Sequence, residues 1–307
     1  MENKIKHIPV LVKEVTDYLA LEKGMTILDC TVGMGGHAEE ILSRVGDTGY
    51  LIGIDRDFEV LKEAKLRLSK VSNRFRLFHS DYRNLDSVLK TAEMDEIDGA
   101  IFDLGASSFQ MENAERGFSI KADGPLDMRM DTSEKLRAAD IINKYSKPEL
   151  IDIFEKYGDE YFAGRIAERI VRERKNEAIE TTGRLADIVQ EALPYKFRFR
   201  RIHPATKVFM ALRMAVNKEL EGLETGLLKV AVVLKKDSRL CVIAFHSAED
   251  RVVKNRFKEF AKTGTFKIIT KKPIQPSENE VRDNPRSRSA KLRVAEKMQR
   301  EETGLKL

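Results

Sequence analysis

The first hundred residues alternate between short apolar runs and amphipathic segments. The apolar runs, which predict strands, cover residues 25–31, 50–54 and 97–104, and residues 74–78 alternate between polar and apolar positions as a strand does. The segments between them carry apolar side chains at helical spacing and cover residues 38–45, 58–68 and 85–89. Strands that alternate with helices in this way predict stacked βαβ units and a mainly parallel sheet, which is an α/β fold.

The next clear strand, residues 239–245, follows only after a gap of about 135 residues. A crossover between parallel strands needs only about a dozen residues, so the gap must hold an insertion. Its pattern is helical, at residues 148–157, 161–174, 184–193 and 205–220. Beyond residue 245 we predict a helix at 248–261, strands at 265–270 and 290–295, and a mobile loop at 271–289, which is rich in Pro, Asn, Ser and Arg.

These patterns divide the chain into three segments. Residues 1–112 form the first part of the sheet domain, residues 113–214 an inserted all-helical domain, and residues 215–307 the second part of the sheet domain. With 307 residues, 42% of them hydrophobic, the chain can bury a core without disulfides. Both cysteines, Cys30 and Cys241, lie in apolar runs, which excludes a disulfide scaffold and a cysteine-based metal site.

The sequence shows neither a membrane span nor a signal peptide. Its longest purely apolar runs, 230–234 and 240–245, are far shorter than the roughly 20 residues that a spanning helix needs. The first nine residues contain charges and no apolar stretch. We therefore expect a soluble, cytoplasmic protein.

Positive charge is concentrated in three segments, although the net charge is only +5. Residues 194–218 hold seven basic and no acidic side chains. Residues 251–272 hold eight basic side chains and one acidic one, and residues 281–300 hold seven basic and two acidic side chains. Such segregation is typical of a face that binds a polyanion such as a nucleic acid. The alternative is a set of solvated helix surfaces.

A glycine-rich turn follows the first strand and precedes the first helix. Gly33, Gly35 and Gly36 allow a tight turn and a close approach of a ligand to the backbone. Asp55 lies 22 residues after Gly33, at the end of the second strand, where an acid can bind ribose hydroxyls. The pattern predicts a nucleotide-type cofactor but does not separate NAD from S-adenosylmethionine. No Gly-Lys-Ser/Thr P-loop is present, which disfavours ATP hydrolysis.

Further polar residues end the third and fourth strands. Asp81 and Tyr82 are placed to flank an adenine, or they form an ordinary turn. Asp103 follows a buried run at the edge where α/β sheets bind ligands, or it caps a helix. His37 either belongs to the site or caps the helix that follows the glycines.

Eight motifs along nearly the whole chain carry a resemblance to a known family. They are HIPVL (7–11), the stretch 29–37, DLGASS (103–108), ERGFS (115–119), DGPLDMRMD (123–131), HPATK (203–207), AFHSAEDR (244–251) and NPRSRSAKLR (284–293). In these motifs and in their order the sequence resembles the bacterial RsmH (also called MraW) methyltransferases. Those enzymes methylate the exocyclic N4 amine of a cytosine in small-subunit ribosomal RNA.

The resemblance implies a class I methyltransferase fold with an inserted helical domain, and S-adenosylmethionine as the cofactor. Carried over motif by motif, the cofactor contacts are Gly35, Gly36, His37, Asp55, Tyr82, Asp103 and Gln110. The implied partner is 16S ribosomal RNA, methylated in the decoding region and within the small subunit. No metal is expected, and the oligomeric state is left open between a monomer and a homodimer.

Methylation of a cytosine amine suggests a role for the acid after the fourth strand. The amine lone pair is delocalised into the ring, so an acceptor for an N–H proton and in-line placement both help. We expect Asp103 at the reaction centre, with Ser107 or Ser108 as lesser candidates. An equal alternative is that Asp103 only holds the cofactor.

Candidate RNA contacts come from the insertion and from the strand before residue 246. Residues 195–201 interleave aromatic and basic side chains, which suits both stacking and phosphate contact. The predicted contacts are Arg198, Arg200, Arg201 and His246. For three further arginines, RNA contact and internal pairing both remain open: Arg116, Arg129 and Arg213.

Three other functions compete with an RNA methyltransferase. A ribosome-assembly factor would bind cofactor and RNA without significant methyl transfer, which the intact glycine turn and acids argue against. An NAD-dependent dehydrogenase lacks a convincing hydride-transfer partner. A small-molecule methyltransferase would leave the segregated positive charge without a use.

Overall fold

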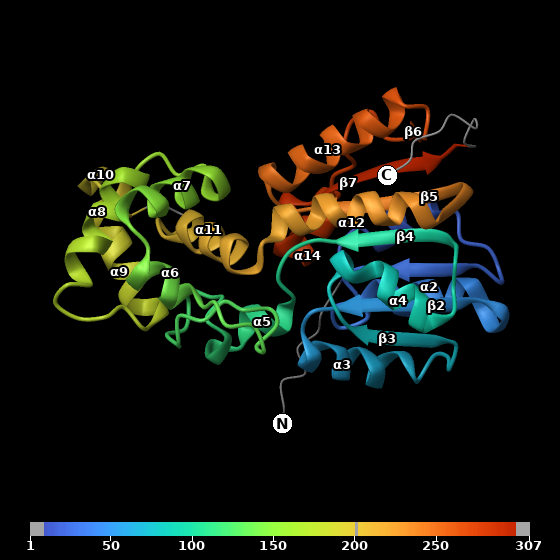
Figure 1. Ribbon diagram of the computed structural model, residues 1–307, viewed down its shortest axis with the longest axis horizontal. Coiled ribbons are helices and arrows are strands. Elements are labelled where there is room, and N and C mark those ends of the chain that lie inside the picture. The colour runs from blue at the N-terminus through green and yellow to red at the C-terminus, as the bar shows by residue number, and fades with distance from the viewer. Residues whose placement is uncertain (1–8, 200–201, 299–307) are drawn as a thin grey trace. The chain divides into compact units, whose positions relative to one another are not determined.

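The structure, a computed structural model, describes residues 9–199 and 202–298. The chain forms two compact units (Figure 1). We call Met1–Gly105 together with Leu220–Leu307 the core unit, and Ala106–Glu219 the helical unit. The predicted insertion, residues 113–214, falls inside the helical unit. Across the described parts of both units, no helix is long and apolar enough to cross a membrane.

The core unit is built on a seven-stranded sheet. Its strands are β1 (Thr26–Asp29), β2 (Tyr50–Asp55), β3 (Phe75–His79), β4 (Ile97–Asp103), β5 (Leu234–Ala244), β6 (Phe266–Ile268) and β7 (Lys291–Lys297). They lie in the order β3-β2-β1-β4-β5-β7-β6; β1 to β5 are parallel, and β7 is antiparallel to both of its neighbours. The predicted α/β fold with a mainly parallel sheet is confirmed, and this strand order is that of a class I methyltransferase.

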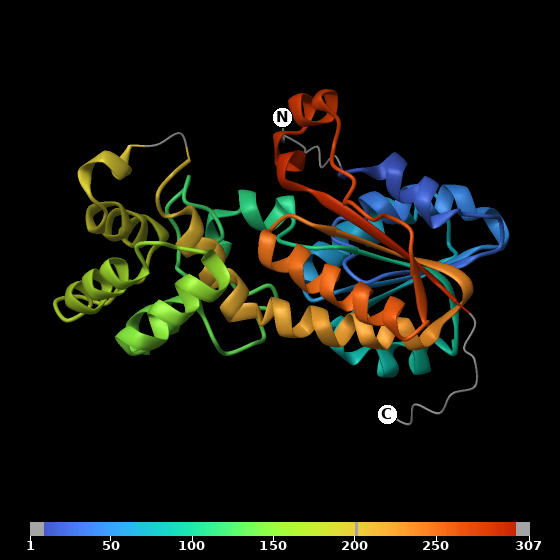
Figure 2. The ribbon, with the colours of Figure 1, turned by 90° about the horizontal axis from the view of Figure 1, so that it is seen from above.

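Helices cover both faces of this sheet (Figure 2). One face carries α1 (Val12–Leu19), α2 (Gly36–Val45) and α3 (Phe58–Leu68), and the other carries α4 (Leu85–Ala92), α12 (Glu219–Val233) and α13 (Ser247–Lys262). Two layers of apolar side chains result, one beneath each set of helices. A strand buried on both faces is apolar throughout, which is why central strands such as β2 are continuous apolar runs in the sequence.

Two segments of the chain differ from prediction. The predicted helix 205–220 ends at Asn217, because Lys218 takes a left-handed conformation (φ +50°), and α12 then begins at Glu219. The expected mobile loop at 271–289 instead contains α14 (Glu278–Asp283) and a 3-10 turn, Pro285–Ser289. Ser277 caps α14, and the Glu280 carboxylate accepts a hydrogen bond from the Leu11 N–H at 2.8 Å, so this segment is tied to the start of the chain.

The helical unit contains the four helices that the insertion predicts, together with shorter ones. Its helices are α5 (Ser108–Glu112), α6 (Ala138–Lys144), α7 (Lys147–Gly158), α8 (Ala163–Glu173), α9 (Thr182–Ala192), α10 (Tyr195–Arg198) and α11 (Thr206–Asn217). Ser146 begins α7 with a capping box and a proline in the first turn, and the Thr181 hydroxyl caps α9. These side chains satisfy backbone N–H groups that have no partner within the helix.

Candidate active site

Three carboxylates end three adjacent strands of the core unit. Asp29 ends β1, Asp55 ends β2 and Asp103 ends β4. In the register of the sheet Asp29 lies opposite Gly53 and Ile101, so all three acids reach the same carboxyl edge. Ligands of α/β sheets bind at this edge, where the direction of the crossovers reverses.

The glycine turn and Asp55 are joined by a hydrogen bond. The Gly33 N–H donates to Asp55 Oδ2 at 2.9 Å, and the Asp57 N–H donates to Asp55 Oδ1 at 2.9 Å. Gly35 has φ +81°, and a β-carbon there would meet the Leu68 side chain at 3.4 Å. The turn therefore requires glycine, and it fixes the backbone beside an acid whose remaining lone pairs can accept hydroxyl hydrogens.

His37 is buried and has a fixed tautomer. Its Nε2 lies 2.9 Å from the carbonyl oxygen of Val10, which can only accept, so Nε2 carries the proton. Burial lowers the pKa of His37 to about 4, which leaves the ring neutral at pH 7. Its other nitrogen, Nδ1, is then an acceptor, and it faces Asp103 Oδ2 at 3.5 Å.

One carboxyl oxygen of Asp103 has no hydrogen-bond partner among the described residues. Its backbone N–H donates to the Thr31 hydroxyl at 2.6 Å, which ties the end of β4 to the end of β1. Its Oδ1 is buried, and no hydrogen-bond partner for it exists among the described residues. Burial raises the pKa of Asp103 to about 7 and that of Asp29 to about 8, the latter also through the charges of Asp103 and Asp55. A cationic or hydrogen-donating ligand would fit this edge, because it would partner the orphaned oxygen and favour the ionised carboxylates.

Tyr82 and Gln110 have structural contacts of their own. The Tyr82 ring is buried, packs edge-on against Phe102 with centroids 5.4 Å apart, and lies against Gly226 of α12. In the helical unit, Gln110 Oε1 accepts the Ser107 N–H at 2.9 Å, and Ser107 Oγ accepts the Gln110 N–H, which together form the capping box of α5. Ser108 is buried at the start of α5.

Asp81 and Asp29 are acids whose burial the sequence did not reveal. Asp81 is buried at the end of β3, accepts the Arg83 N–H at 2.7 Å and pairs with Arg56 at 3.0 Å. Asp29 was predicted only as part of a strand end, although it shares the edge with Asp103. The available sequence signal was, for Asp29, an acid at the end of an apolar run and, for Asp81, an acid shortly after a predicted strand.

The candidate RNA contacts have separate environments. Arg198 donates to the carbonyl oxygens of Leu193 and Glu191 at 2.8 Å, so it closes the carboxyl end of α9. His246 begins α13, where its Nδ1 accepts the Ala248 N–H at 3.1 Å. It follows β5 three residues after Ile243, which pairs with Asp103 in the sheet. The other two predicted contacts, Arg200 and Arg201, lie outside the described residues.

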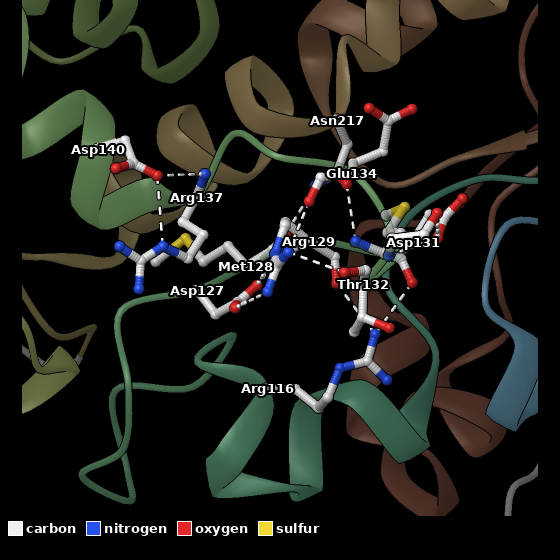
Figure 3. A network of polar contacts seen from close by, with 12 residues as sticks. Arg116, Asp127, Met128, Arg129, Asp131, Thr132, Glu134, Arg137, Asp140 and Asn217 are labelled. Atoms are coloured by element: carbon white, nitrogen blue, oxygen red, sulfur yellow. Dashed lines mark hydrogen bonds and ion pairs between the residues drawn. The ribbon is translucent and has the colours of Figure 1, made fainter.

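The long motif 123–131 folds into a polar network in the helical unit (Figure 3). The Arg129 guanidinium donates to both oxygens of Asp127 at 2.8 and 2.6 Å, and to the carbonyl oxygens of two later residues, Thr132 and Glu134. Arg116 donates to the carbonyl oxygens of Arg129 and Met130 at 3.0 Å. Both arginines are therefore paired within the helical unit.

Asn217 connects this network to α11. Its side chain accepts the Met130 N–H and donates to the Met128 carbonyl oxygen, both at 2.8 Å. Met128 is fully buried and has φ +63°, a costly conformation for a residue with a side chain. Arg213, the third arginine, forms a bidentate pair with Glu219 at 2.9 and 3.0 Å.

The strand order and the glycine turn facing Asp55 are those of a class I methyltransferase. Comparison with known sequences gives the family: the chain belongs to the MraW methylase family, whose model matches residues 4–298. This confirms the resemblance seen in the motifs.

Two relatives of high sequence identity agree with this membership. The chain is 44% identical over 309 residues to the ribosomal RNA small subunit methyltransferase H of Halothermothrix orenii, covering 96% of this chain and 99% of the relative. It is 46% identical over 294 residues to the protein of the same name from Persephonella marina, covering 96% and 100%. Among solved structures, an rRNA methylase from Streptococcus thermophilus aligns with a TM-score of 0.47 and 13% identity over 95% of this chain and 99% of that one.

Proposed function

We propose that this protein transfers a methyl group from S-adenosylmethionine to the exocyclic N4 amine of a cytosine in the decoding region of 16S ribosomal RNA. The observation that carries the proposal is the buried Oδ1 of Asp103, which has no hydrogen-bond partner among the residues described and lies at the edge beside the glycine turn. An amine that loses a proton needs such an acceptor. The names of the relatives support ribosomal RNA as the substrate class, and the motif resemblance supports the N4 amine.

The residues at the edge suit the proposed cofactor. The turn at Gly35 and Gly36 would approach it closely, Asp55 would accept its ribose hydroxyls, and Asp103 and His37 would lie beside its polar groups. Tyr82 and Gln110 stay in the proposed contact set on the motif resemblance alone. When bound, S-adenosylmethionine supplies an electrophilic methyl group on a sulfonium. Three acids at one edge are appropriate neighbours for that positive charge.

Asp103 is proposed to take the amine proton. When N4 receives the methyl group, Asp103 Oδ1 would accept one N4 proton, which would turn the carboxylate into a neutral acid. The Nδ1 of His37 faces the other carboxyl oxygen and can accept a hydrogen bond from the protonated group. The fixed tautomer of His37 therefore stabilises the acid form of Asp103 at the end of the step.

The helical unit is proposed to bind the RNA around the target base. Tyr195 and Phe199 are 77% and 74% exposed, and their rings meet edge-on with centroids 5.7 Å apart. Lys196 and Arg198 supply positive charge within the same short segment. Exposed rings among cations are suited to unstacked bases of single-stranded RNA, and swinging a base out is least costly in an irregular RNA segment.

Transfer of a labelled methyl group tests the function directly. Unmodified small ribosomal subunits and protein-free small-subunit RNA would serve as acceptors in parallel, and the product base would be identified by mass. We expect N4-methylcytosine in at least one acceptor, and an Asp103→Ala variant that binds the cofactor but transfers slowly. Cofactor binding without label in either acceptor would instead favour an assembly factor. An Asp103→Ala variant of normal rate would refute the catalytic role.

Charge reversal in the predicted RNA segment tests the recognition step. Arg200→Glu with Arg201→Glu should weaken RNA binding, flatten its salt dependence and leave cofactor affinity unchanged. Arg198 is left intact in this variant because it also closes α9. Unchanged RNA affinity would exclude these two arginines as contacts.

A further inference from the structure

The core unit has a cationic cavity that the proposed reaction does not use. It lies between α13, the end of β6 and β7. The residues that line it are Lys254, Phe257, Lys258, Ile268, Thr270, Lys271 and Arg293. Phe257 and Thr270 are buried, so the floor is fixed, while the three lysines are exposed.

Like charges around this cavity repel one another in the isolated protein. Lys254 and Lys258 lie one turn apart on the same face of α13, where like charges destabilise a helix. Lys271 approaches from the segment after β6, and Arg293 from β7. Asp250 accepts a hydrogen bond from Arg293 Nε at 2.6 Å, so the charge of this acid is already paired with that of Arg293. The residues that line the cavity thus include three lysines and one arginine and no acid, and a bound anion would offset their charge.

The chemistry of the cavity favours a phosphate. Three of its four cations are lysines, whose compact ammonium groups act as point charges on a phosphate oxygen from several directions. Carboxylates of an acidic protein are better matched by the planar fork of arginine, and the arginine here is already paired with Asp250. The surrounding sequence, residues 251–272, is one of the strongly basic segments.

We infer that this cavity binds a backbone phosphate of the ribosomal RNA substrate, held by Lys254, Lys258 and Lys271. The inference rests on the proposed function, because the substrate RNA supplies the phosphate. A phosphate contact of this kind fixes the position of an RNA without reading its sequence. The core unit would thus contribute to RNA affinity independently of the stacking side chains of the helical unit.

The salt dependence of RNA binding tests the inference. The variant is Lys254→Gln, Lys258→Gln and Lys271→Gln in the full chain. Its matched control replaces three exposed lysines outside the cavity, Lys23, Lys65 and Lys70, by glutamine and so has the same net charge. RNA affinity would be measured by fluorescence anisotropy of labelled small-subunit RNA between about 0.05 and 0.5 M salt, where affinity follows the number of neutralised phosphates.

Loss of one phosphate contact on single-stranded RNA should lower the slope by about 0.7 in the cavity variant and weaken its affinity roughly 4-fold near 0.15 M salt. The control should keep the slope within experimental error of the native protein, and Lys→Arg at the three cavity positions should restore it. Equal slopes in the cavity variant and the control would overturn the inference. An equal loss of RNA affinity in both would overturn it too. Cofactor affinity, measured by calorimetry, should be the same in all variants.

The same proteins separate this inference from the proposed function. Native protein that methylates small-subunit RNA while the cavity variant keeps its slope and KM would refute only the phosphate site. Native protein that transfers no label to any ribosomal acceptor would refute the proposed function itself. If inorganic phosphate or an acidic protein binds at the cavity and RNA does not, RNA is not the occupant.

Discussion

Replacing Asp103 by asparagine should make the ligand-free protein more stable and less active. The carboxyl group pays a burial cost that the amide does not, because burial raises the pKa of Asp103 from 3.8 to about 7. An asparagine has nearly the same shape. Its amide can donate to the Nδ1 of His37, which is an acceptor because Nε2 donates to the Val10 carbonyl oxygen.

The magnitude follows from linkage between protonation and folding. An acid with a raised pKa binds more protons folded than unfolded between these two values, so stability falls as the pH rises from about 4 to about 7. A difference of about three pKa units at about 1.4 kcal/mol each gives a cost of about 4 kcal/mol at pH 8. Asp103→Asn should recover up to about that amount at pH 8 and almost none at pH 4.

Urea denaturation of the ligand-free protein at the two pH values measures this effect. The control is Asp250→Asn, which removes the partner of Arg293 and should destabilise the protein at pH 8. A stability gain of equal size at pH 4 and pH 8 would show that the effect is not ionisation, and no gain at pH 8 would refute the burial argument. Methyl transfer by Asp103→Asn should be lost although the fold is more stable, since the amide cannot take a proton.

Three further predictions address the glycine turn, the polar network and the stacking side chains. Gly35→Ala should weaken S-adenosylmethionine binding in calorimetry, because φ +81° costs an L-residue about 1–2 kcal/mol; unchanged affinity would contradict this. Arg129→Lys should lower the free energy of unfolding by about 1–3 kcal/mol, since lysine cannot replace its bidentate bonds; a native melting curve would be inconsistent with a structural role. Tyr195→Ala with Phe199→Ala should reduce RNA affinity about tenfold or more while stability stays within about 0.5 kcal/mol, and full RNA affinity would exclude stacking there.

The centre of the sheet was predictable from sequence because strands such as β2 are buried on both faces. Leu51, Ile52 and Ile54 of β2 are all fully buried, so the strand is a continuous apolar run. Helix α12 was missed for an equally physical reason. A β-carbon at Gly226 would lie 2.7 Å from the Tyr82 ring, so close packing requires glycine at a place where glycine weakens the helical pattern.

The candidate site was predictable only in part. Asp55 and Asp103 were found because polar residues directly follow apolar strands. The contact of His37 with Val10 joins residues 27 positions apart, and that of Asp103 with Thr31 joins residues 72 apart. No local pattern contains such contacts. Tyr82 was expected beside an adenine, but the position of α12, which the sequence did not show, determines its packing.

The position of the helical unit in the sequence has a consequence for how the chain folds. Strands β4 and β5 are neighbours at the centre of the sheet, yet Asp103 and Leu234 are separated by the whole insertion. Closing a flexible loop of that length costs about 4 kcal/mol of chain entropy. During synthesis at about 5–20 residues per second, β4 therefore waits on the order of ten seconds for its partner, with an unpaired edge exposed. Early and independent folding of the helical unit would shorten the effective loop and the period in which nascent chains can aggregate through that edge.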